Sequence, residues 1–275
     1  MPGSQTRFHR NAWDPGSFVK GNQTLFVAVS TGCFPQLSFQ ESLDRLVDLD
    51  FTAVEIVVGG SVGQLLPSAI ASNFERITAL CRTVRRLTPS AYYFDVDTAD
   101  DRYFADFTLC CRLAKATKVV AVTVRSSVRG TPFNEEVERL RGLVRLATQE
   151  GVVVGLVPEA DRIANDVDTT SLFCRSVPGL QVTLDPSQFL LGATPSPVDP
   201  FEPLLDRVCH VRLRDSTKDA LQVRVGQGDA DYGRLVGQLR KVNYQRGLCA
   251  DLQPLPGLDQ DAELRKMRLF LESLI

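Results

Sequence analysis

The sequence predicts a (β/α)₈ barrel, and three observations support this. Strand-like apolar runs alternate with amphipathic helical segments along the chain, which is typical of parallel βα units. The strand-like runs number eight, as in a closed barrel of this type. The chain has 275 residues, of which 44% are hydrophobic, and this suits one large core. A doubly wound open sheet shares the local pattern and stays open as an alternative.

The predicted strands follow a polar amino-terminal segment. Residues 1–22 are rich in proline and glycine and predict an arm, so the barrel domain is expected over residues 23–275. Trp13 lies in this arm, where its ring would cover the bottom of the barrel or a partner chain. In chain order the predicted strands are Thr24–Ser30, Thr52–Val58, Ala91–Val96, Val119–Val124, Val152–Val157, Leu180–Asp185, Val208–Leu213 and Leu248–Leu252.

Helical periodicity fills the segments between these strands. Leu43, Leu46 and Val47 recur at helical spacing after the first strand, which predicts a helix with one buried face. Ser38 is of a residue type that caps helix starts, so it predicts where this helix begins.

Charge and hydropathy exclude several classes of partner. The chain carries 31 Lys and Arg against 33 Asp and Glu, a net charge of −2, so no overall field attracts nucleic acid or anionic lipid. Its apolar runs are far shorter than the roughly 20 residues of a membrane helix, and its start shows no signal pattern. We therefore expect a cytoplasmic protein without nucleic-acid or membrane partners. A homo-oligomer is left open.

The seven cysteines predict reduced core thiols. They are odd in number, show no CxxC spacing and fall mostly in apolar patterns. Cys33 and Cys249 lie near strand ends, but a nucleophilic cysteine needs a neighbouring base. The chain offers only His9 and His210 for that purpose.

Polar residues close most of the predicted strands. In a barrel of this type the chemistry lies at the carboxyl ends of the strands, so these residues are candidates for one pocket. Glu55 has a plain alternative as a rim residue bonded to neighbouring backbone. The candidates are Ser30, Thr31, Glu55, Asp95, Asp97, Arg125, Glu159, Asp185, Arg212, Arg214 and Asp251.

Four motifs in the second half carry a resemblance to a known family. They are Leu184-Asp185-Pro186-Ser187-Gln188-Phe189, the run 210–215 (HVRLRD), the run 226–232 (GQGDADY) and Asn243-Tyr244. Together with Glu55 on the second strand, the chain over residues 24–273 resembles the xylose isomerase-like sugar phosphate isomerase/epimerase family. This resemblance implies a TIM barrel.

The resemblance also implies one divalent metal, Mn, Mg, Zn or Co, held by residues that end the fifth to eighth strands. The family's ligands there are Glu, Asp, His and Glu, and Asp185 matches the second of them. Val157, Arg212 and Asp251 fall at the other three positions. Gln188 falls where the family has a substrate-contacting histidine.

Arg212 decides the interpretation of this site. A guanidinium is permanently cationic and cannot ligate a metal, so we expect Arg212 to lie between Asp185 and Asp251 and to supply the metal's charge. The expected site has no cofactor. An alternative register gives a single-metal site of Glu159, Asp185, His210 and Asp251. Side-chain alternation argues against it, because it places His210 one layer deeper than Arg212.

Three function hypotheses follow. An isomerase or epimerase would move a proton with Glu159 or Asp251 while Arg212 or Arg214 polarises the oxygen. A second hypothesis is a catalytically inactive binding, regulatory or assembly protein. An apurinic endonuclease of the endonuclease IV type is set aside, because two histidines cannot build its metal cluster.

The expected ligand is a small sugar, polyol or sugar phosphate. Its predicted contacts are Glu55, Arg125, Gln188, His210, Arg212 and Arg214. Arginines suit phosphate or carboxylate, although Arg125 and Arg129 could instead pair with Asp95, Asp97 or Asp215. The run 226–228 (GQG) lacks the spacing of a nucleotide-binding loop. It predicts a turn before a helix near Tyr232, capped by Asp229 or Asp231.

Overall fold

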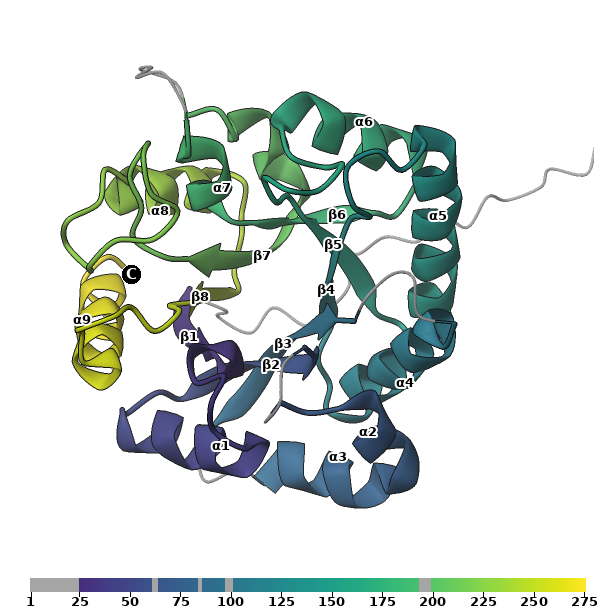
Figure 1. The fold of residues 1–275 in the computed structure, drawn as a ribbon, viewed down its shortest axis with the longest axis horizontal. Helices are drawn as coiled ribbons and strands as arrows, with labels where there is room; N and C mark the ends of the chain where they lie inside the picture. Colours follow the sequence, from purple (N-terminus) through teal and green to yellow (C-terminus); the bar gives the residue numbers. More distant parts are fainter. Residues whose placement is uncertain (1–24, 61–63, 84–85, 97–100, 193–198) are drawn as a thin grey trace, which may run out of the picture.

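The structure is a computed structural model that describes residues 25–60, 64–83, 86–96, 101–192 and 199–275. Eight parallel strands pair in chain order, and the first also pairs with the last, so that the sheet closes into a barrel (Figure 1). The predicted (β/α)₈ barrel is confirmed and the open sheet is excluded. The predicted arm and Trp13 lie outside the described residues.

Each predicted strand overlaps an observed one, and the run 208–213 has the same bounds. The strands are β1 Phe26–Ser30, β2 Ala53–Gly59, β3 Thr88–Asp95, β4 Ala121–Arg125, β5 Val153–Val157, β6 Gln181–Leu184, β7 Val208–Leu213 and β8 Gly247–Ala250.

Helices surround the barrel (Figure 1). They are α1 Phe39–Asp48, α2 Pro67–Ser72, α3 Phe74–Thr83, α4 Tyr103–Ala116, α5 Phe133–Gln149, α6 Val167–Ser176, α7 Pro186–Leu190, α8 Tyr232–Lys241 and α9 Gln260–Glu272, with 3₁₀ turns η2 Thr31–Cys33 and η3 Glu202–Arg207. Ser38 caps α1 as predicted, in a capping box with Glu41. Asp231 caps α8, which settles the choice between the two predicted caps.

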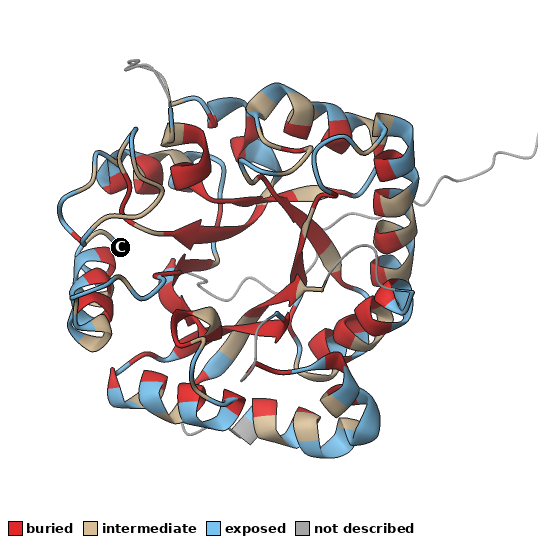
Figure 2. Cartoon of the chain, in the orientation of Figure 1, coloured by how far each residue is buried: buried red, intermediate tan, exposed pale blue. Residues whose placement is uncertain are grey.

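The main core lies between the barrel and its helices, where buried residues line both layers (Figure 2). Strand β2 shows how the sequence builds it. Val54, Ile56 and Val58 belong to this core, and because side chains alternate along a strand, Glu55 between them points into the barrel. The interior of the barrel therefore carries the polar groups that the outer layer excludes.

The seven cysteines are free and buried, as the sequence predicts. Burial raises the pKa of the Cys33 and Cys249 thiols well above the usual value. Neither therefore offers the thiolate that nucleophilic catalysis requires. Within the described part of the chain, no helix has the length and apolar composition to cross a membrane.

Candidate functional site

Strand β7 lines the interior with two basic side chains that share one acidic partner. His210 Nε2 lies 2.8 Å from Glu55 Oε2, and Arg212 Nε lies 3.3 Å from Glu55 Oε1. His210 and Arg212 are two residues apart and point to the same side, as alternation predicts. The predicted residues Glu55 and His210 therefore lie one layer below the carboxyl ends of the strands.

The next layer joins β6, β7 and β8. Arg212 Nη2 lies 3.0 Å from Asp251 Oδ2, and Arg214 Nη2 lies 2.5 Å from the same oxygen. Arg214 Nη2 also lies 3.1 Å from Asp185 Oδ2. The expectation that Arg212 lies between Asp185 and Asp251 is wrong. Arg214 takes that place, because it directly follows β7, two residues beyond Arg212 and toward the barrel mouth, where Asp185 directly follows β6.

Burial and mutual attraction fix the charges in these layers. Glu55 is fully buried and Arg212 is 5% exposed. Burial alone would raise the pKa of Glu55, but the Arg212 charge and the His210 hydrogen bond outweigh it and lower the pKa to about 2. The pKa of Arg212 is raised well above its usual value, because Asp251 and Glu55 outweigh its burial. Both groups are charged at neutral pH.

Tyr93 on β3 belongs to the site, although the sequence did not single it out. The guanidinium carbon of Arg212 lies 4.2 Å from the centroid of the Tyr93 ring, a cation–π distance. The Tyr93 hydroxyl donates to Glu159 Oε1 at 3.2 Å. Tyr92 and Tyr93 are adjacent in the sequence, and a confident alternation pattern would have been needed to tell which of them faces inward.

Glu159 follows β5 on a loop that the backbone holds in place. Its N–H donates to the Ala164 carbonyl at 3.0 Å, and its own carbonyl accepts from the Arg162 N–H at 3.0 Å. Arg162 Nε lies 3.7 Å from Glu159 Oε2. Burial raises the pKa of Glu159 and outweighs the attraction of Arg125, Arg212 and Arg162. Glu159 therefore keeps a proton up to a higher pH than an ordinary glutamate does.

The other predicted contacts are bound to neighbouring protein groups. Arg125 pairs with Asp95, which is the alternative that the sequence left open for it. Gln188 Oε1 accepts from the Ala160 N–H at 3.2 Å, and this bond ties α7 to the loop that carries Glu159. Asp185 caps α7 by accepting from the Ser187 N–H at 3.1 Å.

The glycine-rich run after β7 is a turn, as predicted. Asp215 Oδ2 accepts from the Gly226 N–H at 2.6 Å and from the Gly228 N–H at 3.1 Å. A Cβ atom at Gly228 would lie 1.8 Å from Asp215 Oδ1, so only glycine fits there. The two glycines thus secure an acidic loop residue beside Arg214.

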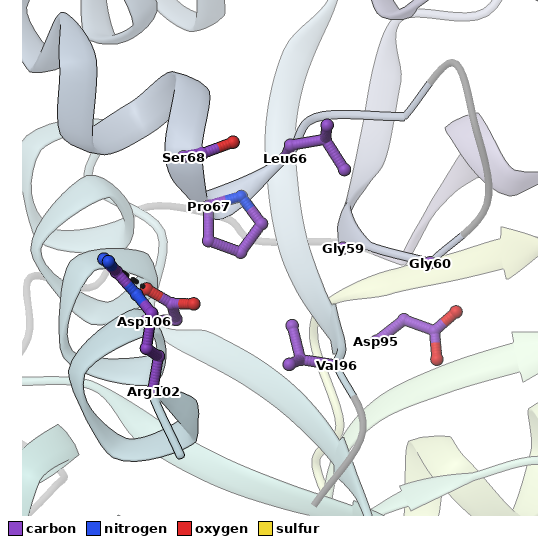
Figure 3. A pocket seen from close by; sticks show the side chains of 9 residues that line it. All are labelled: Gly59, Gly60, Leu66, Pro67, Ser68, Asp95, Val96, Arg102 and Asp106. Carbon is purple, nitrogen blue, oxygen red and sulfur yellow. Dashed lines mark ion pairs between the residues drawn. The ribbon is translucent and has the colours of Figure 1, made fainter. Parts of the chain in front are cut away.

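A cavity of about 530 Å³ lies at the carboxyl ends of β2 and β3 (Figure 3). Its lining residues are Gly59, Gly60, Leu66, Pro67, Ser68, Asp95, Val96, Arg102 and Asp106. Asp106 pairs with Arg102 across 3.5 Å, and Asp95 belongs both to this cavity and to the Arg125 pair. The carboxyl face therefore has room for a ligand that extends past Asp95.

The side chains at the family's metal positions do not fit a divalent ion. Val157 is buried in an apolar cluster with Val57 and Tyr93, so the fifth strand offers no ligand there. The guanidinium groups of Arg212 and Arg214 contact the two carboxylates that remain, Asp185 and Asp251. A metal ion would lie directly beside two fixed positive charges.

A different group of metal-ligand types lies deeper in the barrel. Among the described residues, potential ligand atoms of Glu55, His210 and Cys249 lie within 4.8 Å of one another. Such a set suits zinc by chemical type. However, Arg212 Nε lies 3.3 Å from Glu55 Oε1, and this fixed positive charge disfavours a bound cation there.

The fold and the sequence together define the family. The chain belongs to the xylose isomerase-like TIM barrel family, whose model matches residues 43–271. This confirms the resemblance inferred from the four motifs. A comparison with curated proteins gave no match.

Several solved structures share this fold. A xylose isomerase-like TIM barrel protein from Mycobacterium smegmatis in complex with magnesium is 15% identical over 90% of this chain and 97% of that one, with a TM-score of 0.73. The 3-keto-D-glucoside 4-epimerase YcjR from E. coli is 14% identical over 92% and 100%, with a TM-score of 0.69. The probable 3-DHS dehydratase AsbF from Bacillus anthracis is 16% identical over 90% and 98%, with a TM-score of 0.66. At such identities the likeness concerns the fold alone.

Proposed function

We propose that the barrel mouth binds a small sugar or polyol without a metal ion, and that Arg212 and Arg214 provide the positive charge in its place. The names of the structurally similar epimerase and dehydratase indicate that those enzymes act on small, oxygen-rich molecules. That similarity supports the ligand class. The two arginines support the metal-free mode, because they already contact Asp185 and Asp251.

One observation carries the proposed ligand class. Among the described residues, buried atoms without a hydrogen-bond partner at the carboxyl ends of the strands include both donors and acceptors. Arg214 Nε and Arg162 Nε are donors, whereas Asp251 Oδ1 is an acceptor. A hydroxyl group donates and accepts at once. A polyhydroxylated ligand therefore matches both kinds of atom.

A catalytic role is a second candidate, and Glu159 favours it. A general acid or base works best when its pKa lies near the working pH, and burial raises the pKa of Glu159 toward that range. Asp251 is less suited to this role, because it contacts two guanidinium groups. The reaction would be a proton transfer next to a carbonyl, with Glu159 as the proton carrier and Arg214 near the oxygen.

Metal analysis and sugar binding test the proposal together. We expect elemental analysis of the purified protein to give far less than one divalent ion per chain, and binding of monosaccharides and polyols in calorimetry to be unchanged by EDTA. Arg214→Lys keeps the charge but loses the fork that contacts two carboxylates. It should weaken binding about tenfold, while Arg141→Lys on the surface should not.

The opposite results would be equally clear. About one tightly held divalent ion per chain, or loss of sugar binding with EDTA, would overturn the metal-free mode. Failure to bind any sugar or polyol would favour an inactive assembly protein that keeps only the barrel. Proton exchange at the carbon next to a ligand carbonyl, followed by NMR in heavy water, would separate an enzyme from a binding protein.

A further inference from the structure

The ion pairs at the barrel mouth leave acidic groups in excess. Among the described residues they join four guanidinium groups and the His210 imidazole to six carboxylates. The guanidinium groups belong to Arg125, Arg162, Arg212 and Arg214, and the carboxylates to Glu55, Asp95, Glu159, Asp161, Asp185 and Asp251. Carboxylates therefore outnumber the basic side chains at the mouth, although the sequence led us to expect an arginine-rich, anion-binding site.

The excess charge falls on Glu159. Asp161 also contacts Arg162, but its side chain is 77% exposed, so water screens its charge. The Glu159 side chain is 18% exposed, and its cationic neighbour Arg162 Nε stays 3.7 Å away. Its hydrogen bond comes from the neutral Tyr93 hydroxyl. Among the enclosed carboxylates of the mouth, Glu159 thus has the longest ion pair, and Arg125 and Arg212 attract its charge from further away.

The arginines have little capacity left for an anion. Arg212 contacts Glu55 and Asp251, Arg214 contacts Asp185 and Asp251, and Arg125 pairs with Asp95. A phosphate that contacted these guanidinium groups would also lie close to the carboxylates that they already pair with, and these would repel it. The charge balance therefore disfavours a sugar phosphate.

We propose that the ligand carries a protonated amine that pairs with Glu159, so that the preferred class is an amino sugar or amino polyol. This inference rests on the proposed function and makes its ligand class narrower. The amine supplies the positive charge that the four guanidinium groups do not. The ligand hydroxyls meet the unpaired donors and acceptors of Arg214 and Asp251.

Proton release gives the proposal a second signature. Burial raises the pKa of Glu159, so the free protein keeps a proton on this group up to a higher pH than an ordinary glutamate does. An amine binds to the carboxylate form. Its affinity should therefore rise with pH as Glu159 ionises, and binding below that range should release a proton to the buffer.

Matched ligands test the charge preference. Calorimetry at neutral pH would compare glucosamine with glucose and glucose 6-phosphate, the same three forms of galactose and mannose, and Tris with its neutral counterpart pentaerythritol. We expect each amine to bind at least tenfold more tightly than its neutral parent, and the phosphates to bind most weakly. A parent sugar or a phosphate that binds as tightly as the amine would overturn the inference and leave the proposed function standing.

Variants localise the effect. Glu159→Gln should abolish the amine preference and the proton release, whereas Asp161→Asn, which removes an exposed charge, should keep both. An amine preference that survives Glu159→Gln would overturn the assignment to this residue. If no amine, neutral sugar or phosphate binds, the proposed function and this inference fail together.

Discussion

Tyr93 connects the two parts of the site, because its ring lies under the Arg212 guanidinium at 4.2 Å and its hydroxyl donates to Glu159 at 3.2 Å. Tyr93 thus contacts both the permanently charged Arg212 on β7 and the titratable Glu159 after β5.

Replacing Arg212 should destabilise the fold strongly. Arg212→Met removes one of the two basic partners of each of the buried carboxylates Glu55 and Asp251, and breaking a buried pair lowers the free energy of unfolding by about 3–5 kcal/mol. Chemical denaturation measures this change. Arg141→Met removes an exposed pair with Glu138 and should change stability by less than about 1 kcal/mol. Equal effects of the two variants would contradict the buried network.

Glu55 should make the protein sensitive to acid. Its folded pKa of about 2 lies below the usual 4.5, so it stabilises the fold above pH 4.5 and loses this contribution as pH falls toward 2. The advantage of the wild type over Glu55→Gln should shrink by about 3 kcal/mol across this range. Denaturation at several pH values measures it, with Glu138→Gln as the surface control. A difference in stability that stays constant with pH would show that the pKa of Glu55 is not lowered in the folded state.

Glu159 should change the pH dependence of stability in the opposite direction. Its folded pKa is raised, so the folded state binds a proton more tightly than the unfolded state, and stability falls as pH rises from about 4.5 through the folded pKa. The Glu159→Gln variant has no ionisable group at this position, so its stability does not fall in this way as pH rises. We expect this variant to be more stable than the wild type at neutral pH and the difference to vanish in acid, as unfolding curves would measure. A variant that is less stable at neutral pH would contradict the raised pKa.

Gly228 and Gly237 should respond oppositely to alanine. A Cβ atom at Gly228 would meet Asp215 Oδ1 at 1.8 Å, whereas nothing lies within 4 Å of one at Gly237. Gly228→Ala should lower the free energy of unfolding by about 1–3 kcal/mol through overpacking. Gly237→Ala, in α8, should raise it by about 0.5–1 kcal/mol, because glycine is a poor helix former. Thermal unfolding compares the two variants directly.

Restoring a metal site should require three changes. Val157→Glu and Arg212→His recreate two ligands of the family pattern, but Arg214 still contacts Asp185 and Asp251. We expect the double variant to bind no divalent ion in calorimetry, and the same variant with Arg214→Ser to gain binding. Metal binding by the double variant would show that Arg214 moves aside easily.

The sequence predicted the barrel well because its signal is repeated. Eight strand-like runs each overlap an observed strand, and errors of one to three residues at the ends do not change the topology. The partners of Arg212 were harder to predict. Whether Arg212 or Arg214 lies between Asp185 and Asp251 depends on a shift of two residues along β7, which no local pattern reveals.

Tyr93 shows a second limit of the sequence. Its importance comes from contacts with Arg212 on β7 and Glu159 after β5, which are far away in the chain. Glu159 presents a related case, because its raised pKa depends on burial by several strands together. Residue types at strand ends indicate where the chemistry lies. Which of these charges pair with one another can be determined only from distances in the folded structure.

The position of His210 has a practical consequence. The chain has two histidines, and His9 lies in the predicted arm, so the imidazole next to Glu55 is the sole one among the residues that the structure describes. Its ring protons resonate apart from most other signals and need no isotope label once His9 is replaced. A single NMR peak would therefore report from inside the barrel whenever a compound enters or the acidity changes.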